Sequence, residues 1–171
     1  MNNYKENFHI YLLIDCSASM TGEPIEAVRQ AIRELIIELK DDLSILENVY
    51  ISVIVFDSVA RHIIPLVKFD NFLAPDINSG GISIFNEALK LLEISVKENK
   101  SNFKPIVFVF TDGYLTGEWK DMAKKLKKNV NFIYCIAGAK ADKNSLNFLT
   151  NSTIILNTLS YGDFSQFLYW N

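Results

Sequence analysis

The chain has 171 residues, of which 49% are hydrophobic, enough for one sizeable core and too few for two. Its 17 basic and 20 acidic residues give a net charge of −3, which argues against a nucleic-acid or anionic-membrane partner. Cys16 and Cys135 lie far apart without the spacing of a metal site or a disulfide framework, a pattern typical of a reducing compartment. We therefore expect a single domain over residues 1–171.

The N-terminal stretch is polar up to Asn7 and is followed by a short apolar run that ends at Asp15. This run is too short for the core of a signal peptide or for a membrane-spanning helix. The expectation is a soluble, cytoplasmic protein without a membrane partner.

Short β-branched and aromatic runs alternate with longer stretches of helical periodicity along the chain. Strands are predicted at 8–15, 48–57, 60–67, 105–112, 130–138 and 152–157. Helices are predicted at 24–42, 84–98, 118–128, 144–150 and 162–170. Such alternation favours parallel strands joined by crossover helices. The predicted fold is a doubly wound, Rossmann-like α/β sheet of six strands with helices on both faces.

The positions of some strands in this sheet follow from their sequences. The runs at 10–14 and 106–110 show no polar alternation, as a strand covered on both faces requires, so they are predicted to be central. Only Ser58 and Val59 separate two other strands, and so short a connection turns the chain back on itself. The sheet is therefore expected to be mostly parallel, with 60–67 as one antiparallel edge strand.

Oxygen-bearing side chains gather where the two central strands end. Asp15 and Asp112 terminate these strands. Ser17 and Ser19 follow at alternate positions, which point to one side in an extended loop. Ligands of open α/β sheets bind beyond the carboxyl ends of the strands, where the Gly-rich stretch 78–83 can also approach. Carboxylates and hydroxyls suit a hard cation, Mg²⁺ before Ca²⁺, with Mn²⁺ as an alternative.

Two motifs carry a family resemblance: DCSASM at 15–20, followed by a turn into a helix, and FTDG at 110–113. They resemble the metal-ion-dependent adhesion site of von Willebrand factor A (vWA) domains, Asp-x-Ser-x-Ser with a separate Thr and a separate Asp. The order of motifs along the whole chain is similar to that of bacterial vWA proteins of the TerY type, from tellurite-resistance clusters. The resemblance implies that Ser17 and Ser19 bind the ion directly. It also implies that the carboxylates Asp15 and Asp112 bind directly or through water.

One ligand of this motif is replaced in the sequence. The Thr expected after the double glycine is Ile82, whose aliphatic side chain offers no oxygen. The site loses one ligand unless Ser83 or water takes its place, which weakens or abolishes metal binding. Gly81, Tyr114 and Leu115 are predicted to form the rim that contacts a partner.

Three functions remain open at this point. The first is a non-enzymatic interaction module whose metal ion binds an acidic side chain of a partner protein. For this module the TerY-type resemblance implies the bacterial cytoplasm, a stress or signalling system, and a kinase and a PP2C-like phosphatase as partners. The second is a metal-free scaffold that binds partners through its loops. The third, a metal-dependent phosphohydrolase, is disfavoured because the sequence has no P-loop and no Lys or His in the motif loops.

Several nearby residues have simpler explanations. Cys16 is expected to point toward the sheet as a packed thiol, and His62 to lie on the edge strand without a metal. Trp119 is explained by core packing as well as by a partner-binding rim. The basic run at 124–129 is interpreted as the solvated face of an amphipathic helix.

Overall fold

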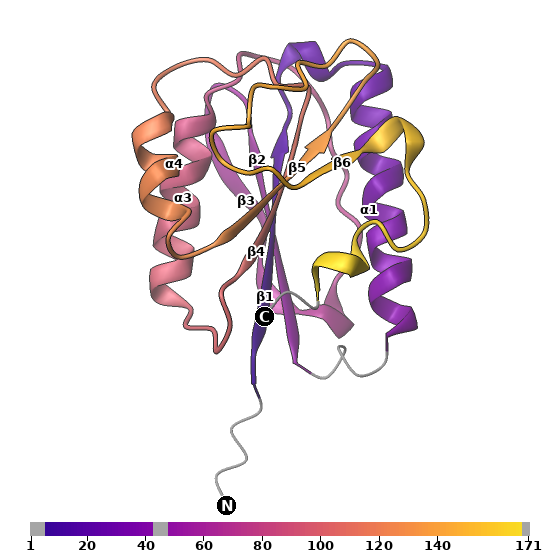
Figure 1. Ribbon diagram of the computed structural model, residues 1–171, viewed down its shortest axis with the longest axis vertical. Helices are drawn as coiled ribbons and strands as arrows, with labels where there is room; N and C mark the ends of the chain where they lie inside the picture. The colour runs from indigo at the N-terminus through magenta and orange to yellow at the C-terminus, as the bar shows by residue number, and fades with distance from the viewer. Residues whose placement is uncertain (1–5, 43–47, 169–171) are drawn as a thin grey trace, which may run out of the picture.

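A six-stranded sheet runs through the middle of the structure, a computed structural model that describes residues 6–42 and 48–168 (Figure 1). The strands are β1 (Phe8–Asp15), β2 (Val49–Phe56), β3 (Ala60–Lys68), β4 (Ile106–Thr111), β5 (Asn131–Ile136) and β6 (Thr153–Ile155). The α-helices of the described residues are α1 (Glu23–Asp41), α3 (Phe85–Glu98) and α4 (Lys120–Leu126). Short 3₁₀ turns lie at Ala18–Met20, Phe69–Asn71, Leu156–Thr158 and Ser165–Phe167.

The strand order is β3-β2-β1-β4-β5-β6. Strand β1 pairs in parallel with β2 on one side and with β4 on the other, and β5 and β6 continue the parallel arrangement. Strand β3 pairs antiparallel with β2 at the edge. These pairings confirm the mostly parallel sheet, the central position of the two apolar runs and the antiparallel edge strand. The winding reverses between β1 and β4.

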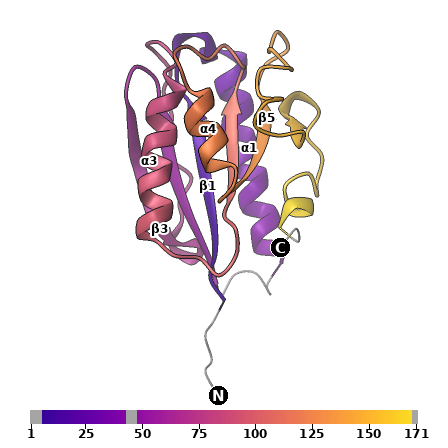
Figure 2. The same ribbon diagram turned by 60° about the vertical axis from the view of Figure 1, so that its left-hand side comes forward.

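Different segments cover the two faces of the sheet (Figures 1 and 2). Helix α1 and the C-terminal segment lie on one face, where they pack against Leu12 and Phe108. Helices α3 and α4 lie on the other face, where they pack against Leu13 and Val109. Neighbouring residues of a strand point to opposite faces, so each central strand contributes to both cores. This arrangement confirms the doubly wound fold with helices on both faces.

Two of the predicted helices are wrong. Residues 144–149 form a run of turns, in which bonds such as that from the Leu149 N–H to the Leu146 carbonyl close single turns without the continuous ladder of an α-helix. The side chain of Asp142 also accepts the N–H of Asn144, a local bond that competes with helix formation. The predicted closing helix at 162–170 consists of turns and a single 3₁₀ turn up to residue 168, and its last two residues lie outside the described range.

The C-terminal segment is fastened to α1 by one buried side chain, Glu38. Its carboxylate accepts hydrogen bonds from the backbone N–H groups of Gly162, Phe164 and Ser165 at 3.0, 3.2 and 2.7 Å. The ring of Phe164 packs edge-on against Phe108 of β4, with the centroids 5.4 Å apart. Glu38 therefore satisfies N–H groups that a continuous helix would have paired internally.

His9 is a buried histidine on β1, near the end of the sheet opposite the motif loops. Within residues 6–42 and 48–168, its Nδ1 has no hydrogen-bond partner. Its ring lies edge-on to those of Tyr11 and Tyr50. Burial lowers the pKa of His9 from its ordinary value of 6.5, since the charged imidazolium would lose its hydration.

We expect His9 to make the protein less stable as the pH falls below about 6.5. The unfolded chain then binds a proton that the folded chain does not, so the free energy of unfolding falls by at most about 1.4 kcal/mol per pH unit. His9→Phe keeps a ring against Tyr11 and Tyr50 and removes this titration. Urea unfolding at about pH 7.5 and 5.5 should therefore show a smaller change in His9→Phe than in wild type.

The exposed His62 provides the control for this comparison. Burial also lowers its pKa, but its greater exposure makes the effect on stability smaller. His62→Gln should therefore retain most of the wild-type pH dependence. A pH dependence of His9→Phe equal to that of wild type would show that His9 is not the group that titrates.

Candidate functional site

The carboxyl ends of β1 and β4 bring Asp15 and Asp112 to the same edge of the sheet. Both side chains are buried. Because the winding reverses between these two strands, the loops that follow them diverge. The structure thus places the two predicted carboxylates at the topological position where ligands of open α/β sheets bind.

Asp15 is the centre of a buried hydrogen-bond network. Its Oδ1 accepts the backbone N–H of Ser17 at 2.9 Å. Its Oδ2 accepts the hydroxyls of Ser83 and Thr111 at 3.0 and 2.7 Å. Thr111 in turn accepts the N–H of Gly113 at 3.0 Å. Asp15 therefore ties together the loop after β1, the loop before α3 and the end of β4.

The surroundings of Asp15 act on its pKa in opposite directions. Burial raises the pKa above the usual value of 3.8, whereas hydrogen bonds from Ser17, Thr111 and Ser83 lower it. A divalent cation nearby would further favour the ionised carboxylate.

Ser17 and Ser19 bring two hydroxyl oxygens together, 3.2 Å apart. Ser17 is buried, whereas Ser19 is exposed. Neighbouring ligands around an octahedral Mg²⁺ with bonds of about 2.1 Å lie about 3 Å from each other. The spacing of these hydroxyls therefore fits two adjacent ligands of one small cation.

The donor set is hard and contains few charges. In the parts of the chain that the structure describes, no three Asp, Glu, His or Cys side chains come together as a metal-binding group. The oxygens at the site belong to two carboxylates and several hydroxyls. Such a set fits Mg²⁺ or Mn²⁺ better than a metal that prefers nitrogen or sulfur ligands.

Ile82 and Ser83 have different surroundings. The Ile82 side chain is 59% exposed, and its N–H donates to the Ser58 hydroxyl at 3.3 Å. Ser83 is 3% exposed, and its hydroxyl donates to Asp15. The Ser83 carbonyl also accepts the N–H and the hydroxyl of Thr116 at 2.9 and 2.7 Å. The hydroxyl beside Asp15 therefore comes from position 83, one residue later than the family pattern predicts.

The three predicted rim residues differ in accessibility. Tyr114 is exposed, and its hydroxyl donates to the carbonyl of Lys140 at 2.9 Å. Gly81 is also exposed, and its φ of +80° is a conformation that favours glycine. Leu115 instead is half-buried and packs against the core under α3 and α4, because the chain turns inward after Gly113. Its contact with a partner therefore stays a prediction.

A groove of about 450 Å³ opens beside Ser19 and Asp112. Its other lining residues are Thr21, Glu23, Pro24, Tyr114, Ala137, Gly138, Ala139, Lys140 and Ala141. Ser19 and Asp112 therefore face one common hollow, and Tyr114 borders it.

Three residues with simpler explanations lie where the sequence predicts them. Cys16 is buried in the core under α1, and burial raises the pKa of its thiol to about 12. Trp119 is buried against Phe85, with ring centroids 5.4 Å apart, which favours core packing over a rim. His62 is exposed on β3, where its Nδ1 lies 3.3 Å from the Ser52 hydroxyl.

Thr111 is a site residue that the sequence interpretation missed. Its position could have indicated this, because a hydroxyl at the last residue of a central strand, directly before Asp112, must lie near the end of the neighbouring strand β1.

None of the described helices is both long and apolar enough to cross a membrane.

Comparisons with known proteins agree on the fold. The SpRpn10 VWA domain is 14% identical, with a TM-score of 0.60 over 86% of this chain and 88% of that one. Proximal thread matrix protein 1 from the mussel byssus is 19% identical, with a TM-score of 0.67 over 87% of this chain and 44% of that one. An aerotolerance-related membrane protein from Bacteroides fragilis is 18% identical, with a TM-score of 0.58 over 77% and 68%.

At these identities the structural likeness shows the fold alone, and this chain spans less than half of the mussel protein. No match was found among curated protein sequences. The family model of the von Willebrand factor type A domain, however, matches residues 9–167, nearly the whole chain. The chain therefore belongs to the von Willebrand factor type A domain family, a family of protein-interaction modules.

Proposed function

We propose that this protein is a non-enzymatic interaction module that binds an acidic side chain of a partner protein through a divalent cation. The main supporting observation is the arrangement around Asp15. Its carboxylate accepts hydroxyls from the loop before α3 and from the end of β4, while the hydroxyls of Ser17 and Ser19 lie 3.2 Å apart in the adjoining loop. Membership of a family of interaction modules supports a binding role rather than catalysis.

Each residue has a distinct part in this proposal. Ser17 and Ser19 supply hydroxyl oxygens, and Asp112 supplies a carboxylate directly or through water. Both oxygens of Asp15 already accept hydrogen bonds, so its main part is to orient the groups that surround the ion. A bound Mg²⁺ would keep several waters, and one of these positions is open to a carboxylate of the partner.

Ser83 takes the place that the vWA motif gives to a Thr. A hydroxyl has one proton and two lone pairs. The Ser83 proton points to Asp15, which leaves both lone pairs of its oxygen for a cation. Ile82 then does not remove a ligand, because its exposed side chain lies outside the set.

The wider setting is also a proposal. The order of motifs supports a TerY-type protein of the bacterial cytoplasm, in a tellurite-resistance or other stress system. Partners of the proposed site would include a protein kinase and a PP2C-like phosphatase encoded nearby. The net charge of −3 supports protein partners rather than nucleic acid or an anionic membrane.

Calorimetric titration with Mg²⁺ and with Mn²⁺ tests the cation site and the choice between positions 82 and 83. Wild type should bind at least one of the two ions. Ser83→Ala should bind it about tenfold more weakly, since a hydroxyl beside Asp15 is lost. Ile82→Thr should match wild type, because a side chain that is 59% exposed and has no bond to Asp15 adds no ligand.

Two results would contradict these assignments. If wild type binds neither ion, the site is a metal-free scaffold that contacts partners through its loops. If Ile82→Thr binds more tightly than wild type while Ser83→Ala is unchanged, the ligand position belongs to residue 82.

A further inference from the structure

The loop that delivers Ser83 is held in place from outside. Residues 72–83 connect the end of the β3 region to α3 and form neither helix nor strand. Each irregular residue that is fixed in one conformation loses backbone entropy, and this loop has no ladder of its own to offset that loss. The position of the Ser83 hydroxyl therefore depends on contacts that neighbouring elements make with the loop.

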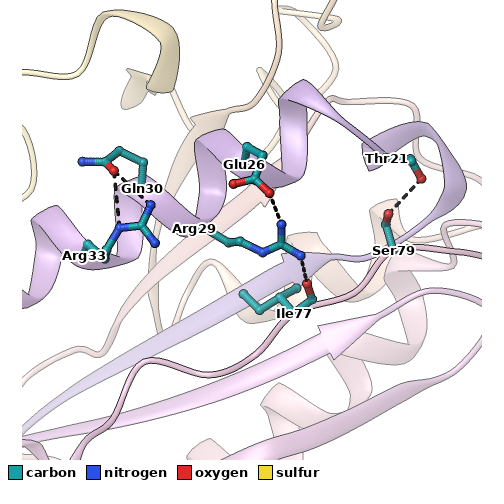
Figure 3. A network of polar contacts seen from close by, with 7 residues as sticks. All are labelled: Thr21, Glu26, Arg29, Gln30, Arg33, Ile77 and Ser79. Carbon is teal, nitrogen blue, oxygen red and sulfur yellow. Dashed lines mark hydrogen bonds and ion pairs between the residues drawn. The ribbon is translucent and has the colours of Figure 1, made fainter.

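Helix α1 and the residue before it supply two of these contacts (Figure 3). The guanidinium of Arg29 donates to the backbone carbonyl of Ile77 and also pairs with Glu26, one turn earlier on the same helix. The hydroxyl of Thr21 lies 2.8 Å from that of Ser79. The Arg29 side chain is 29% exposed, because the loop lies across it.

The next two residues of the loop are fixed to the first motif. The N–H of Gly80 donates to the carbonyl of Cys16 at 2.7 Å. The carbonyl of Gly81 accepts the N–H of Ala18 at 2.8 Å. The loop is thus anchored at four positions, 77, 79, 80 and 81, directly before Ser83. The two backbone anchors involve the same loop that carries Ser17 and Ser19.

We propose that Arg29 and Thr21 are positioning residues of the cation site. They clamp the loop at Ile77 and Ser79 and thereby hold the Ser83 hydroxyl against Asp15. This inference rests on the proposed cation site, because its consequence for binding requires Ser83 to be a ligand. Neither clamp residue contacts Asp15 or Ser83, so each acts through the loop.

The direction in which Arg29→Ala changes the cation affinity distinguishes a positioning role from an effect of charge. A positive charge near a cation site repels the ion, so removal of Arg29 would by charge alone tighten cation binding. A positioning role predicts weaker binding instead. Arg29→Ala should lower the Mn²⁺ affinity about tenfold, the low end for residues that orient metal ligands. Thr21→Val should lower it in the same direction without any change of charge.

Arg33 provides the matched control. It lies one turn further along α1, and its guanidinium donates to the Gln30 side chain at 3.0 Å (Figure 3). It borders a hollow with Ala74, Pro75 and Asp76, but within the described residues it forms no hydrogen bond with the loop. Arg33→Ala removes the same charge from the same helix and should leave the Mn²⁺ affinity within about twofold of wild type.

A double-mutant cycle separates positioning from a general loss of structure. In a Ser83→Ala background there is no hydroxyl left to position, so adding Arg29→Ala should change the Mn²⁺ affinity by less than about twofold. A further tenfold loss in this background would show that Arg29 acts on the site by another route, and would overturn the inference.

Amide hydrogen exchange provides a readout that needs no metal. Residues 78–83 should exchange faster in Arg29→Ala than in wild type, and at the wild-type rate in Arg33→Ala. Equal exchange and equal affinity in the two arginine variants would overturn the clamp. If wild type binds neither Mg²⁺ nor Mn²⁺, the cation site fails and the positioning role fails with it, while faster exchange would still show the Arg29–Ile77 contact to hold the loop.

Discussion

Glu38→Ala should lower the free energy of unfolding by about 4 kcal/mol. Glu38 is 2% exposed, and its carboxylate accepts three backbone N–H groups from the C-terminal segment. Alanine would leave these donors without an acceptor, at about 1–3 kcal/mol each, and water that reaches the partly exposed ones would offset part of the loss. The effect should be large because no helix pairs these groups in any other way.

Urea unfolding followed by circular dichroism measures this effect, and the same helix offers a control. Glu34 lies one turn earlier, is half-buried and accepts a hydrogen bond from the side chain of Gln30. Glu34→Ala should change the free energy of unfolding by less than about 0.5 kcal/mol. The loss of unfolding free energy in Glu38→Gln should lie between those of the two alanine variants, since its amide oxygen can still accept some of the three N–H groups. Equal losses in the two alanine variants would show that the C-terminal segment does not depend on Glu38.

The same contact explains why the end of the chain was harder to predict than its beginning. Phe164 and Phe167 stand at a helical spacing and are buried under α1, so the spacing reflects their burial in the core. It could not indicate the backbone conformation, because the acceptor of the local N–H groups is Glu38, more than 120 residues away in the sequence. The central strands β1 and β4 were predictable because their apolar runs reflect burial on both faces.

The candidate site also contains residues that the sequence could place and residues that it could not. Asp15 and Asp112 could be placed from the sequence, since Asp15 ends and Asp112 directly follows a strand whose position in the sheet was predictable. For the position of the missing Thr, the sequence left Ser83 and water as alternatives, because an irregular loop has no periodicity to show which of two neighbouring side chains faces inward. Arg29 was overlooked for another reason: on an amphipathic helix an arginine reads as a solvent-facing residue until the loop across it is known.

The two carboxylates of the candidate site should differ sharply in what their removal does. Asp15→Ala should weaken Mn²⁺ binding about 100-fold and lower the free energy of unfolding by about 2 kcal/mol. The second loss follows because the Ser17 N–H and the hydroxyls of Ser83 and Thr111 lose their acceptor. This loss of stability stays moderate because burial of the Asp15 carboxylate itself costs free energy, as its raised pKa shows. Alanine removes that cost together with the hydrogen bonds.

Asp112→Ala is the matched variant at the rim of the groove. It should also weaken Mn²⁺ binding, about tenfold or more, but change the free energy of unfolding by less than about 1 kcal/mol. The bond that its carboxylate accepts from the Tyr114 N–H lies in a loop that reaches solvent, so water can replace it. Unfolding with a chelator present isolates these differences in stability from metal binding.

Thermal unfolding with and without Mg²⁺ then links the two quantities. An ion at about a hundredfold its dissociation constant stabilises the folded state by about 2.7 kcal/mol, so Mg²⁺ should raise the Tm of wild type. At the same concentration Asp112→Ala should keep about half of this stabilisation, about 1.4 kcal/mol, and Asp15→Ala should keep about 0.4 kcal/mol. If both variants keep the full rise in Tm, the ion binds elsewhere. If Asp112→Ala loses as much stability as Asp15→Ala in the chelator, Asp15 does not hold the two loops and the end of β4 together in the way that its hydrogen bonds indicate.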